Sequence, residues 1–262
     1  MEIIIRDSQK AAAFSMLFQN VKVFTELINI SFDDSQMFIQ AMDAANVTVF
    51  EVKLEKDWFD EYTMNESFTM GVNTNIMSKI LSTREKDQHL TMSATKGADD
   101  VEIVFSGNDK SFDKEFVMPQ VDNESDHLGI PDSESNAIFS MPSVTFNSLI
   151  QQLRMFGESA TIKCDENEIS MTANSTETGK MKVVLEQEKL DEYAIDEGED
   201  LEMSFTLNYL NNIAIFNKVA PTVEVNLTKD YPMKIVFYLD EKCEMSRSIA
   251  FYLAPQIDLN ED

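Results

Sequence analysis

Residues 119–135 read PQVDNESDHLGIPDSES, and the rest of the chain is organised around this stretch. Asp, Asn, Ser, Gly and Pro at this density favour a turning or extended backbone over a helix. One apolar island, the LGIP of residues 128–131, interrupts the polar sequence. The composition is typical of a linker, and it predicts a connector between two folded segments.

The segments on the two sides of this connector resemble two copies of one repeated unit. Residues 30–43, ISFDDSQMFIQAMD, and residues 162–174, IKCDENEISMTAN, each predict a strand, an acidic turn and a second strand. Residues 68–81 and 203–216 each predict a strand, an Asn-containing turn and a helix. Equivalent patterns lie about 132 residues apart, and a shared period indicates an internal repeat.

This repeat predicts an N-terminal domain at 1–118, the connector at 119–135 and a C-terminal domain at 136–262. Alternating apolar residues predict many strands, and apolar residues at helical spacing predict four short helices. Helices on mostly antiparallel strands indicate an α+β fold. The four helices are expected at residues 11–22, 74–83, 143–156 and 208–218.

Two local features of the second half carry their own predictions. Ser143 directly precedes an apolar helical pattern, and serine is a preferred N-cap residue, so we expect it to cap the third helix. Residues 188–200 are rich in Asp and Glu, and we expect them to form an acidic turn.

Composition limits the class of protein. A hydrophobic fraction of 43% over 262 residues is typical of a folded globular chain with a substantial core. No run of apolar residues is long enough for a membrane helix, and the N-terminus lacks the pattern of a signal peptide. The two cysteines show no metal-ligand spacing and make a disulfide framework unlikely, which suits a reducing intracellular compartment.

Acidic residues are distributed unevenly along the chain. The net charge is −26, with 47 Asp and Glu against 21 Lys and Arg. The four helical windows, residues 9–22, 73–84, 143–156 and 207–218, contain no acidic residue. Their basic residues are Lys10, Lys22, Lys79, Arg84, Arg154 and Lys218.

This distribution has two interpretations. The helices could be covered by other elements and avoid charge for that reason. Alternatively, all four present one surface to a polyanion, because phosphates require positive potential and the absence of carboxylates. The windows show no aromatic platform or arginine-rich recognition helix, so the second interpretation predicts weak, sequence-independent and salt-sensitive contact.

Four short motifs, in order along the chain, resemble the proliferating cell nuclear antigen family of eukaryotic-type sliding clamps. They are Met42-Asp43, the MGVN of 70–73 with the MSKIL of 77–81, the LGIP of 128–131, and the FYLAPQI of 251–257. The resemblance implies two tandem clamp domains in a homotrimeric ring that encircles duplex DNA. The helices would line the channel, the antiparallel sheets would lie outside, and the ring would tether DNA polymerase and other replication and repair proteins.

The resemblance also implies where subunits and clients bind. Subunits would join by pairing edge strands, residues 111–118 of one subunit with 177–185 of the next. The interface residues would be Phe112, Phe116, Lys180, Met181, Lys182 and Val183. Clients of the family dock a short motif, a Gln followed by an aliphatic and two aromatic residues, in a pocket under the connector. The pocket residues would be Met42, Asn46, Val47, Leu128, Ile130, Pro232, Tyr252, Ala254, Pro255 and Ile257.

Several alternatives stay open at this point. The apolar island of the connector could be a packing anchor instead of a pocket wall. The chain could be a checkpoint-type clamp subunit with two different partners, or an acidic interaction scaffold that never touches DNA. Paired turn carboxylates such as Asp33-Asp34 could hold Mg²⁺, although no accompanying pattern supports an enzyme.

Motifs for nucleotide, dinucleotide, zinc and acyl-transfer sites are all missing from the sequence. We therefore expect no catalytic residues, no cofactor and no metal site, and an ATP-dependent loader would have to open the ring. The expected location is the nucleus, or a viral replication compartment in the host cell.

Overall fold

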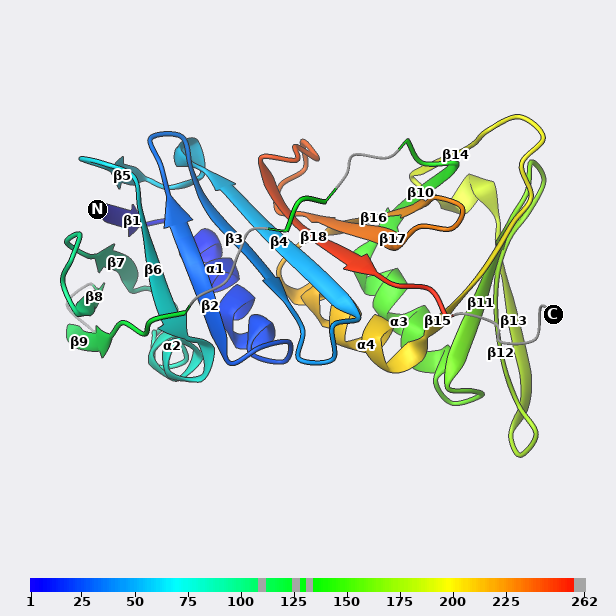
Figure 1. The fold of residues 1–262 in the computed structure, drawn as a ribbon, viewed down its shortest axis with the longest axis horizontal. Coiled ribbons are helices and arrows are strands. Elements are labelled where there is room, and N and C mark those ends of the chain that lie inside the picture. Colours follow the sequence, from blue (N-terminus) through cyan, green and yellow to red (C-terminus); the bar gives the residue numbers. More distant parts are fainter. Residues whose placement is uncertain (108–111, 124–127, 131–133, 257–262) are drawn as a thin grey trace. The chain divides into compact units, whose positions relative to one another are not determined.

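The computed structural model describes residues 1–107, 112–123, 128–130 and 134–256, and the chain divides into two compact units (Figure 1). The first unit comprises Met1–Ala44, Phe50–Leu128 and Glu244–Ser248. The second comprises Ala45–Val49, Gly129–Cys243 and Ile249–Asp262. Each unit is built from antiparallel strands and two α-helices, as the α+β prediction requires.

Two sets of strands form the first unit. A five-stranded sheet has the order β5-β1-β7-β8-β9, and a second run has the order β4-β3-β2-β6. The five-stranded sheet consists of β5 (Glu61–Thr63), β1 (Glu2–Ile5), β7 (His89–Ser93), β8 (Asp100–Ser106) and β9 (Lys114–Pro119). The second run consists of β4 (Thr48–Glu55), β3 (Gln36–Met42), β2 (Leu27–Phe32) and β6 (Phe68–Asn73).

The helices of this unit are α1 (Ser8–Val21) and α2 (Thr74–Leu81), with a 3₁₀ turn η1 (Lys56–Trp58). The predicted apolar stripe of α1 is buried, and its residues Phe14, Leu17, Phe18 and Val21 are each at most 1% exposed. The helix begins earlier than predicted because the carboxylate of Asp7 accepts the N–H groups of Gln9 and Lys10. Asn73 caps α2 in the same way.

The second unit repeats this plan. A run of strands has the order β14-β10-β16-β17-β18, and a four-stranded sheet has the order β13-β12-β11-β15. The first set is β14 (Glu192–Ile195), β10 (Ala137–Pro142), β16 (Thr222–Leu227), β17 (Met233–Tyr238) and β18 (Arg247–Leu253). The second is β13 (Gly179–Leu185), β12 (Ile169–Ser175), β11 (Ser159–Cys164) and β15 (Leu201–Thr206). The helices are α3 (Ser143–Leu153) and α4 (Leu207–Ala214), with 3₁₀ turns η2 (Gln187–Lys189) and η3 (Ile215–Lys218).

The repeat is visible at atomic detail in the two acidic turns. Asp33 Oδ1 accepts the N–H groups of Ser35 and Gln36, at 2.7 and 2.9 Å. Asp165 Oδ1 accepts the N–H groups two and three residues later at the same distances, 2.7 and 2.9 Å. The hydroxyl of Tyr62 donates to the Asp33 carbonyl, and that of Tyr193 donates to the Asp165 carbonyl. Each turn is therefore fixed by one aspartate and one tyrosine.

Two local predictions in the second unit are wrong. The N-cap position of α3 is occupied by Pro142, and Ser143 is the first helical residue. The Ser143 hydroxyl donates to the Ala220 carbonyl at 2.5 Å, because the side chain is completely buried against that segment and cannot turn back to the helix.

The second wrong prediction is the acidic turn at 188–200, which contains strand β14. Its residues pair with β10, with Ala194 opposite Ile138. The acidic composition obscured a short edge strand in which exposed residues alternate with half-buried ones.

The two turn aspartates predict a pH dependence of stability. Partial burial opposes ionisation of Asp33, but its hydrogen bonds from Ser35 and Gln36 hold its pKa below the ordinary 3.8. Hydrogen bonds from Asn167 and Glu168 lower the pKa of Asp165. A lowered folded-state pKa stabilises the fold above the ordinary pKa, and the contribution is lost as pH falls through the folded value. We expect the melting temperature to fall less steeply between pH 5 and about 3 in the variant D33N/D165N than in the wild type.

The matched control is D34N/E197Q, which removes two exposed carboxylates. Its melting temperature should follow the wild-type pH profile. Identical profiles for D33N/D165N and this control would contradict a stabilising role of the two turn aspartates.

Candidate functional site

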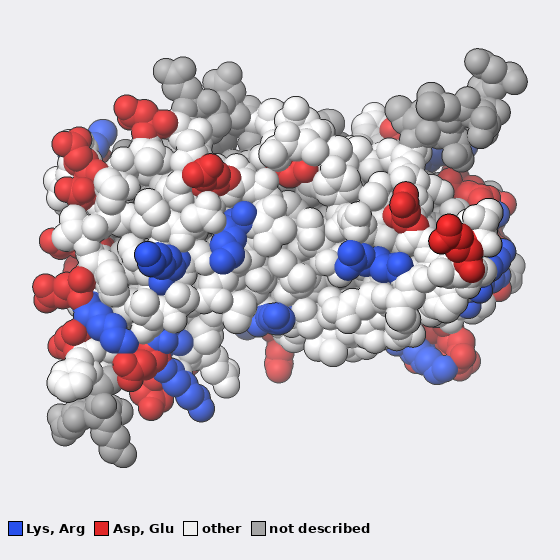
Figure 2. Space-filling model, turned by 90° about the horizontal axis from the view of Figure 1, so that it is seen from below, with Lys and Arg blue, Asp and Glu red and all other residues white. Residues whose placement is uncertain are grey.

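Basic side chains emerge from the ends of the helices in the first unit. Lys22 follows the last residue of α1, and Lys79 lies in the last turn of α2; both are exposed. Neither helix has an acidic residue in its first turn. On the face shown in Figure 2, basic side chains stand among uncharged atoms and most acidic side chains lie at the margins.

Two of the predicted basic residues of this unit are held by their own chain. Lys10 Nζ donates to the Trp58 carbonyl at 2.7 Å and lies 5.7 Å from the centre of its ring. Arg84 Nη1 donates to the carbonyls of Glu85, Lys86 and Gln88, at 3.1, 3.2 and 2.7 Å. Burial lowers the pKa of Arg84 from its ordinary value. Both cations therefore also stabilise local structure.

The second unit contributes two exposed cations from its helices. Arg154 follows α3 and its Nη2 donates to Asn208 Oδ1 at 2.9 Å, and Lys218 ends η3. Apolar side chains are also exposed at the two ends of α3, with Val144 and Met155 each 62% exposed. The helix surface is thus weakly basic and rich in uncharged groups.

A cavity of about 330 Å³ lies within the second unit. Six of the ten predicted pocket residues line it: Asn46, Val47, Ile130, Pro232, Tyr252 and Ala254. The segment after β18 is fixed beside it, because the Ala254 N–H donates to the Val47 carbonyl at 3.1 Å. Lys234 Nζ lies 5.9 Å from the centre of the Tyr252 ring. Pro255 is half-buried but does not line the cavity, and Ile257 lies outside the described residues.

Sequence reasoning missed half of the lining of this cavity. The missed residues are Val49, Gly129, Ser135, Thr228, Tyr231 and Lys234. Val49 could have been found, because residues two apart in an extended segment face the same side, as Val47 and Val49 do. Tyr231 is brought to the cavity by a turn in which Asp230 has a φ of 63°, and no sequence pattern signals that conformation.

Met42 and Leu128, the other two predicted pocket residues, lie together in the first unit. They line a cavity of about 280 Å³. The remaining lining residues are Thr25, Leu27, Asn29, Gln40, Ala41 and Asn123. This cavity lies where residues of the connector contact strands β2 and β3, since Gln40 hydrogen-bonds Leu128 and Asn29 hydrogen-bonds Asn123.

The predicted interface residues lie on or beside edge strands. β9 ends the five-stranded sheet of the first unit, and β13 ends the four-stranded sheet of the second. Phe112 precedes β9 and is 89% exposed, yet its carbonyl accepts the amide of Gln88 at 2.8 Å. Lys182 on β13 is ion-paired with Glu168 at 2.5 Å. Each unit therefore presents an open edge with exposed apolar and charged side chains.

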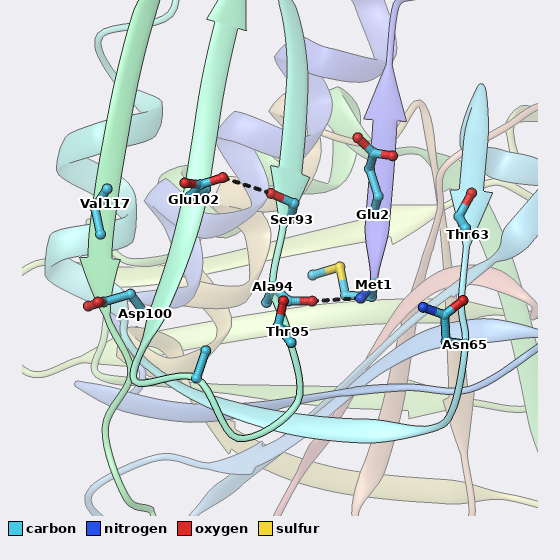
Figure 3. A pocket seen from close by; sticks show the side chains of 11 residues that line it. Met1, Glu2, Thr63, Asn65, Ser93, Ala94, Thr95, Asp100, Glu102 and Val117 are labelled. Atoms are coloured by element: carbon cyan, nitrogen blue, oxygen red, sulfur yellow. Dashed lines mark hydrogen bonds between the residues drawn. The ribbon is translucent and has the colours of Figure 1, made fainter.

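A further hollow, of about 500 Å³, lies on the five-stranded sheet and contains no predicted residue (Figure 3). The Met1 ammonium group donates to the Ala94 carbonyl at 2.6 Å, and Ser93 Oγ is 3.4 Å from Glu102. The carboxylates of Glu2 and Asp100 also line it. The hollow is polar and acidic.

Two kinds of feature are missing from the part of the chain that the structure describes. No helix there is long and apolar enough to cross a membrane. Nor do three or more His, Cys, Asp or Glu side chains come together there in a group that could hold a metal ion.

Comparison with protein families finds two matches that together span nearly the whole chain. The family model described as proliferating cell nuclear antigen, N-terminal domain, matches residues 5–127. The model described as proliferating cell nuclear antigen, C-terminal domain, matches residues 129–256. The order of the two matches is that of the two repeats.

The contacts of Arg84 predict a structural role that Lys79 lacks. We expect Arg84→Ala to lower the free energy of unfolding by about 1–3 kcal/mol, because several hydrogen bonds from a charged group are lost. Lys79→Ala, at an exposed helix position, should change it by less than about 0.5 kcal/mol. Urea unfolding followed by circular dichroism measures both, and equal effects of the two substitutions would contradict this division of roles.

Proposed function

The chain belongs to the proliferating cell nuclear antigen family of DNA sliding clamps, and from this premise we propose that it acts as a homotrimeric ring around duplex DNA. The ring tethers DNA polymerase and other replication and repair proteins as a processivity factor. Its action is topological and not enzymatic. A partner attached to a ring on DNA rebinds before it diffuses away, which raises its effective concentration at the template.

The observation that carries this proposal is the absence of carboxylates from the four helices of a chain with a net charge of −26. The exposed cations Lys22, Lys79, Arg154 and Lys218 would face the phosphates, and Lys10 and Arg84 would add positive potential while holding local structure. Such contact is independent of base sequence and weakens with salt. The ring therefore slides.

Ring closure is proposed to use two of the edge strands, β9 and β13. Unpaired N–H and C=O groups of an edge strand pair readily with another chain. β9 and β13 end different sheets of the same subunit, so head-to-tail pairing of β9 with β13 of the next subunit uses both edges and can close a ring. The interface would comprise Phe112, Phe116, Lys180, Met181, Lys182 and Val183.

Charge and backbone direction favour one register for this pairing. The Gln120 N–H donates to the Asp99 carbonyl, so Pro119, one residue earlier, faces the open edge, where it has no N–H to donate. The N–H groups of β9 that donate to the next subunit must then belong to residues before Pro119. Antiparallel pairing with Glu115 opposite Lys180 also places Asp113 opposite Lys182 and Phe112 opposite Val183. Both carboxylates then meet an ammonium group.

Clients are proposed to dock at the predicted pocket. The cavity around Val47, Ile130 and Tyr252 combines apolar walls with polar groups, which suits a short peptide carrying aliphatic and aromatic anchors. The connector at 119–135, between domains at 1–118 and 136–262, supplies part of its wall. Met42, Asn46, Leu128, Pro232, Ala254, Pro255 and Ile257 complete the proposed pocket.

Loading requires a separate ATP-dependent machine, and we propose the nucleus, or a viral replication compartment, as the place of action. Two alternatives make different predictions. A checkpoint-type clamp subunit would assemble only with two other chains, and an acidic interaction scaffold would bind peptides without any contact with DNA.

The helix cations predict the DNA-binding behaviour. We expect K22E/K79E/R154E to weaken binding to duplex DNA about tenfold or more, with a smaller salt dependence, because fewer phosphate contacts remain. Polymerase processivity should fall with it. The control K56E/K229E/K242E makes the same charge change at exposed positions outside the helical windows and should keep both properties. Full processivity in K22E/K79E/R154E would contradict the proposed DNA contact and favour the acidic interaction scaffold.

The proposed register predicts a charge-swap rescue. Wild-type protein should have a native mass near three times 29.8 kDa. Lys180→Glu places a carboxylate opposite Glu115 in every interface, so its trimers should dissociate at lower micromolar concentrations, and E115K/K180E should restore them. Lys189→Glu, with the same charge change on η2, should stay trimeric. Rescue by E115K/K182E instead would show a register shifted by two residues.

A further inference from the structure

The side chain of Gln40 forms a two-point hydrogen bond with the backbone of the connector. Gln40 Nε2 donates to the Leu128 carbonyl at 2.9 Å, and the Leu128 N–H donates to Gln40 Oε1 at 2.6 Å. The amide thus pairs with both backbone groups of one residue, as a neighbouring strand would. Gln40 lies on β3, so a rigid strand carries this contact.

A buried carboxylate fixes the orientation of the Gln40 amide. Its Nε2 also lies 3.0 Å from Glu51 Oε1, and Glu51 is only 8% exposed. Lys53 Nζ lies 3.2 Å from the other carboxylate oxygen of Glu51 and 5.8 Å from the ring centre of Phe38. The carboxylate accepts but cannot donate, so it holds the NH₂ group toward itself and leaves Oε1 for the Leu128 N–H.

A second set of contacts holds the connector upstream. The Val121 N–H donates to the Gly71 carbonyl at 3.0 Å, and Asn29 Nδ2 donates to the Asn123 carbonyl at 2.8 Å. A Cβ at residue 71 would lie 2.0 Å from the Val121 carbonyl oxygen, so only glycine permits this approach. The connector therefore contacts the strands of the first unit at separate points, and two of them, at Asn123 and Leu128, lie at the 280 Å³ cavity.

We propose that Gln40 is a positioning residue for client docking. Held by Glu51, it keeps Leu128, which lines the 280 Å³ cavity and belongs to the proposed client pocket, in place before any client arrives. This inference rests on the proposed client pocket. Preordering matters because a connector that had to be ordered during binding would subtract that entropy from the affinity. A short side chain at residue 40, or one without both a donor and an acceptor, cannot replace the contact.

The test compares Gln40→Met, which keeps the side-chain length but removes both hydrogen bonds, with Gln36→Met on the same strand. Hydrogen exchange of the Leu128 amide in the free protein should accelerate at least about fivefold in the first variant only. A synthetic peptide carrying a Gln, an aliphatic residue and two aromatic residues should bind it about three- to tenfold more weakly than wild type, by fluorescence anisotropy. The native mass should not change in either variant.

Glu51→Met separates positioning from direct contact, because Glu51 holds Gln40 but does not line the cavity. This substitution should also accelerate hydrogen exchange of the Leu128 amide and lower the affinity for the peptide. Both effects should be smaller than those of Gln40→Met. Unchanged exchange at Leu128, or equal peptide affinity of Gln40→Met and wild type, would overturn the role of Gln40. Failure of wild-type protein to bind the peptide, with no difference from Tyr252→Ala, would instead overturn the client pocket, and the proposed role with it.

Discussion

A surface that meets nucleic-acid phosphates has to exclude carboxylates, and in the proposed ring this electrostatic constraint accounts for the acid-free helices of the chain. An acidic residue near the N-terminus normally stabilises a helix by about 0.3–1 kcal/mol through the helix dipole. None of the four helices has an acidic residue in its first turn. In α1 and α2, the N-cap residues Asp7 and Asn73 supply part of the missing stabilisation, because their side chains accept N–H groups of the first turn. Since charges are screened over about 8 Å at physiological salt, acids on distant turns and sheet faces need not disturb a basic lining.

The repeat supplies the second constraint. Both halves have the same order of strands and helices, and both fix their acidic turn with an aspartate and a tyrosine. Strand β9 ends a sheet in the first half, and β13, which is not its equivalent in the repeat, ends a sheet in the second. An open edge is a hazard for a solitary protein, and pairing between subunits turns it into the contact that closes the proposed ring. Phe112 is exposed, and Gln88 holds its backbone carbonyl. This arrangement suits a side chain that binds the next subunit of the proposed ring.

Much of this could be predicted from the sequence because the patterns are local. Apolar spacing placed the buried stripe of α1, and the two acidic turns revealed the repeat. The failures have tertiary causes. Ser143 does not cap α3 because its hydroxyl is buried against Ala220, and β14 was hidden because an edge strand tolerates acids on its exposed side. The hydrogen bonds of Arg84 and Gln40 join residues to backbone carbonyls whose positions no periodicity reveals. The lining of the 330 Å³ cavity was also missed in part, because Tyr231 reaches it through a turn at Asp230 that no sequence periodicity reveals.

The central claim is that the protein holds DNA by enclosing it. The most direct measurement is retention on circular and linear DNA: protein loaded on a nicked circle by a clamp loader with ATP is separated from free protein at high salt, before and after one cut of the circle. We expect the protein to stay on the intact circle and to leave within minutes of linearisation, because it slides off the ends. Equal retention on circular and linear DNA, or loss from the intact circle at high salt, would contradict topological enclosure.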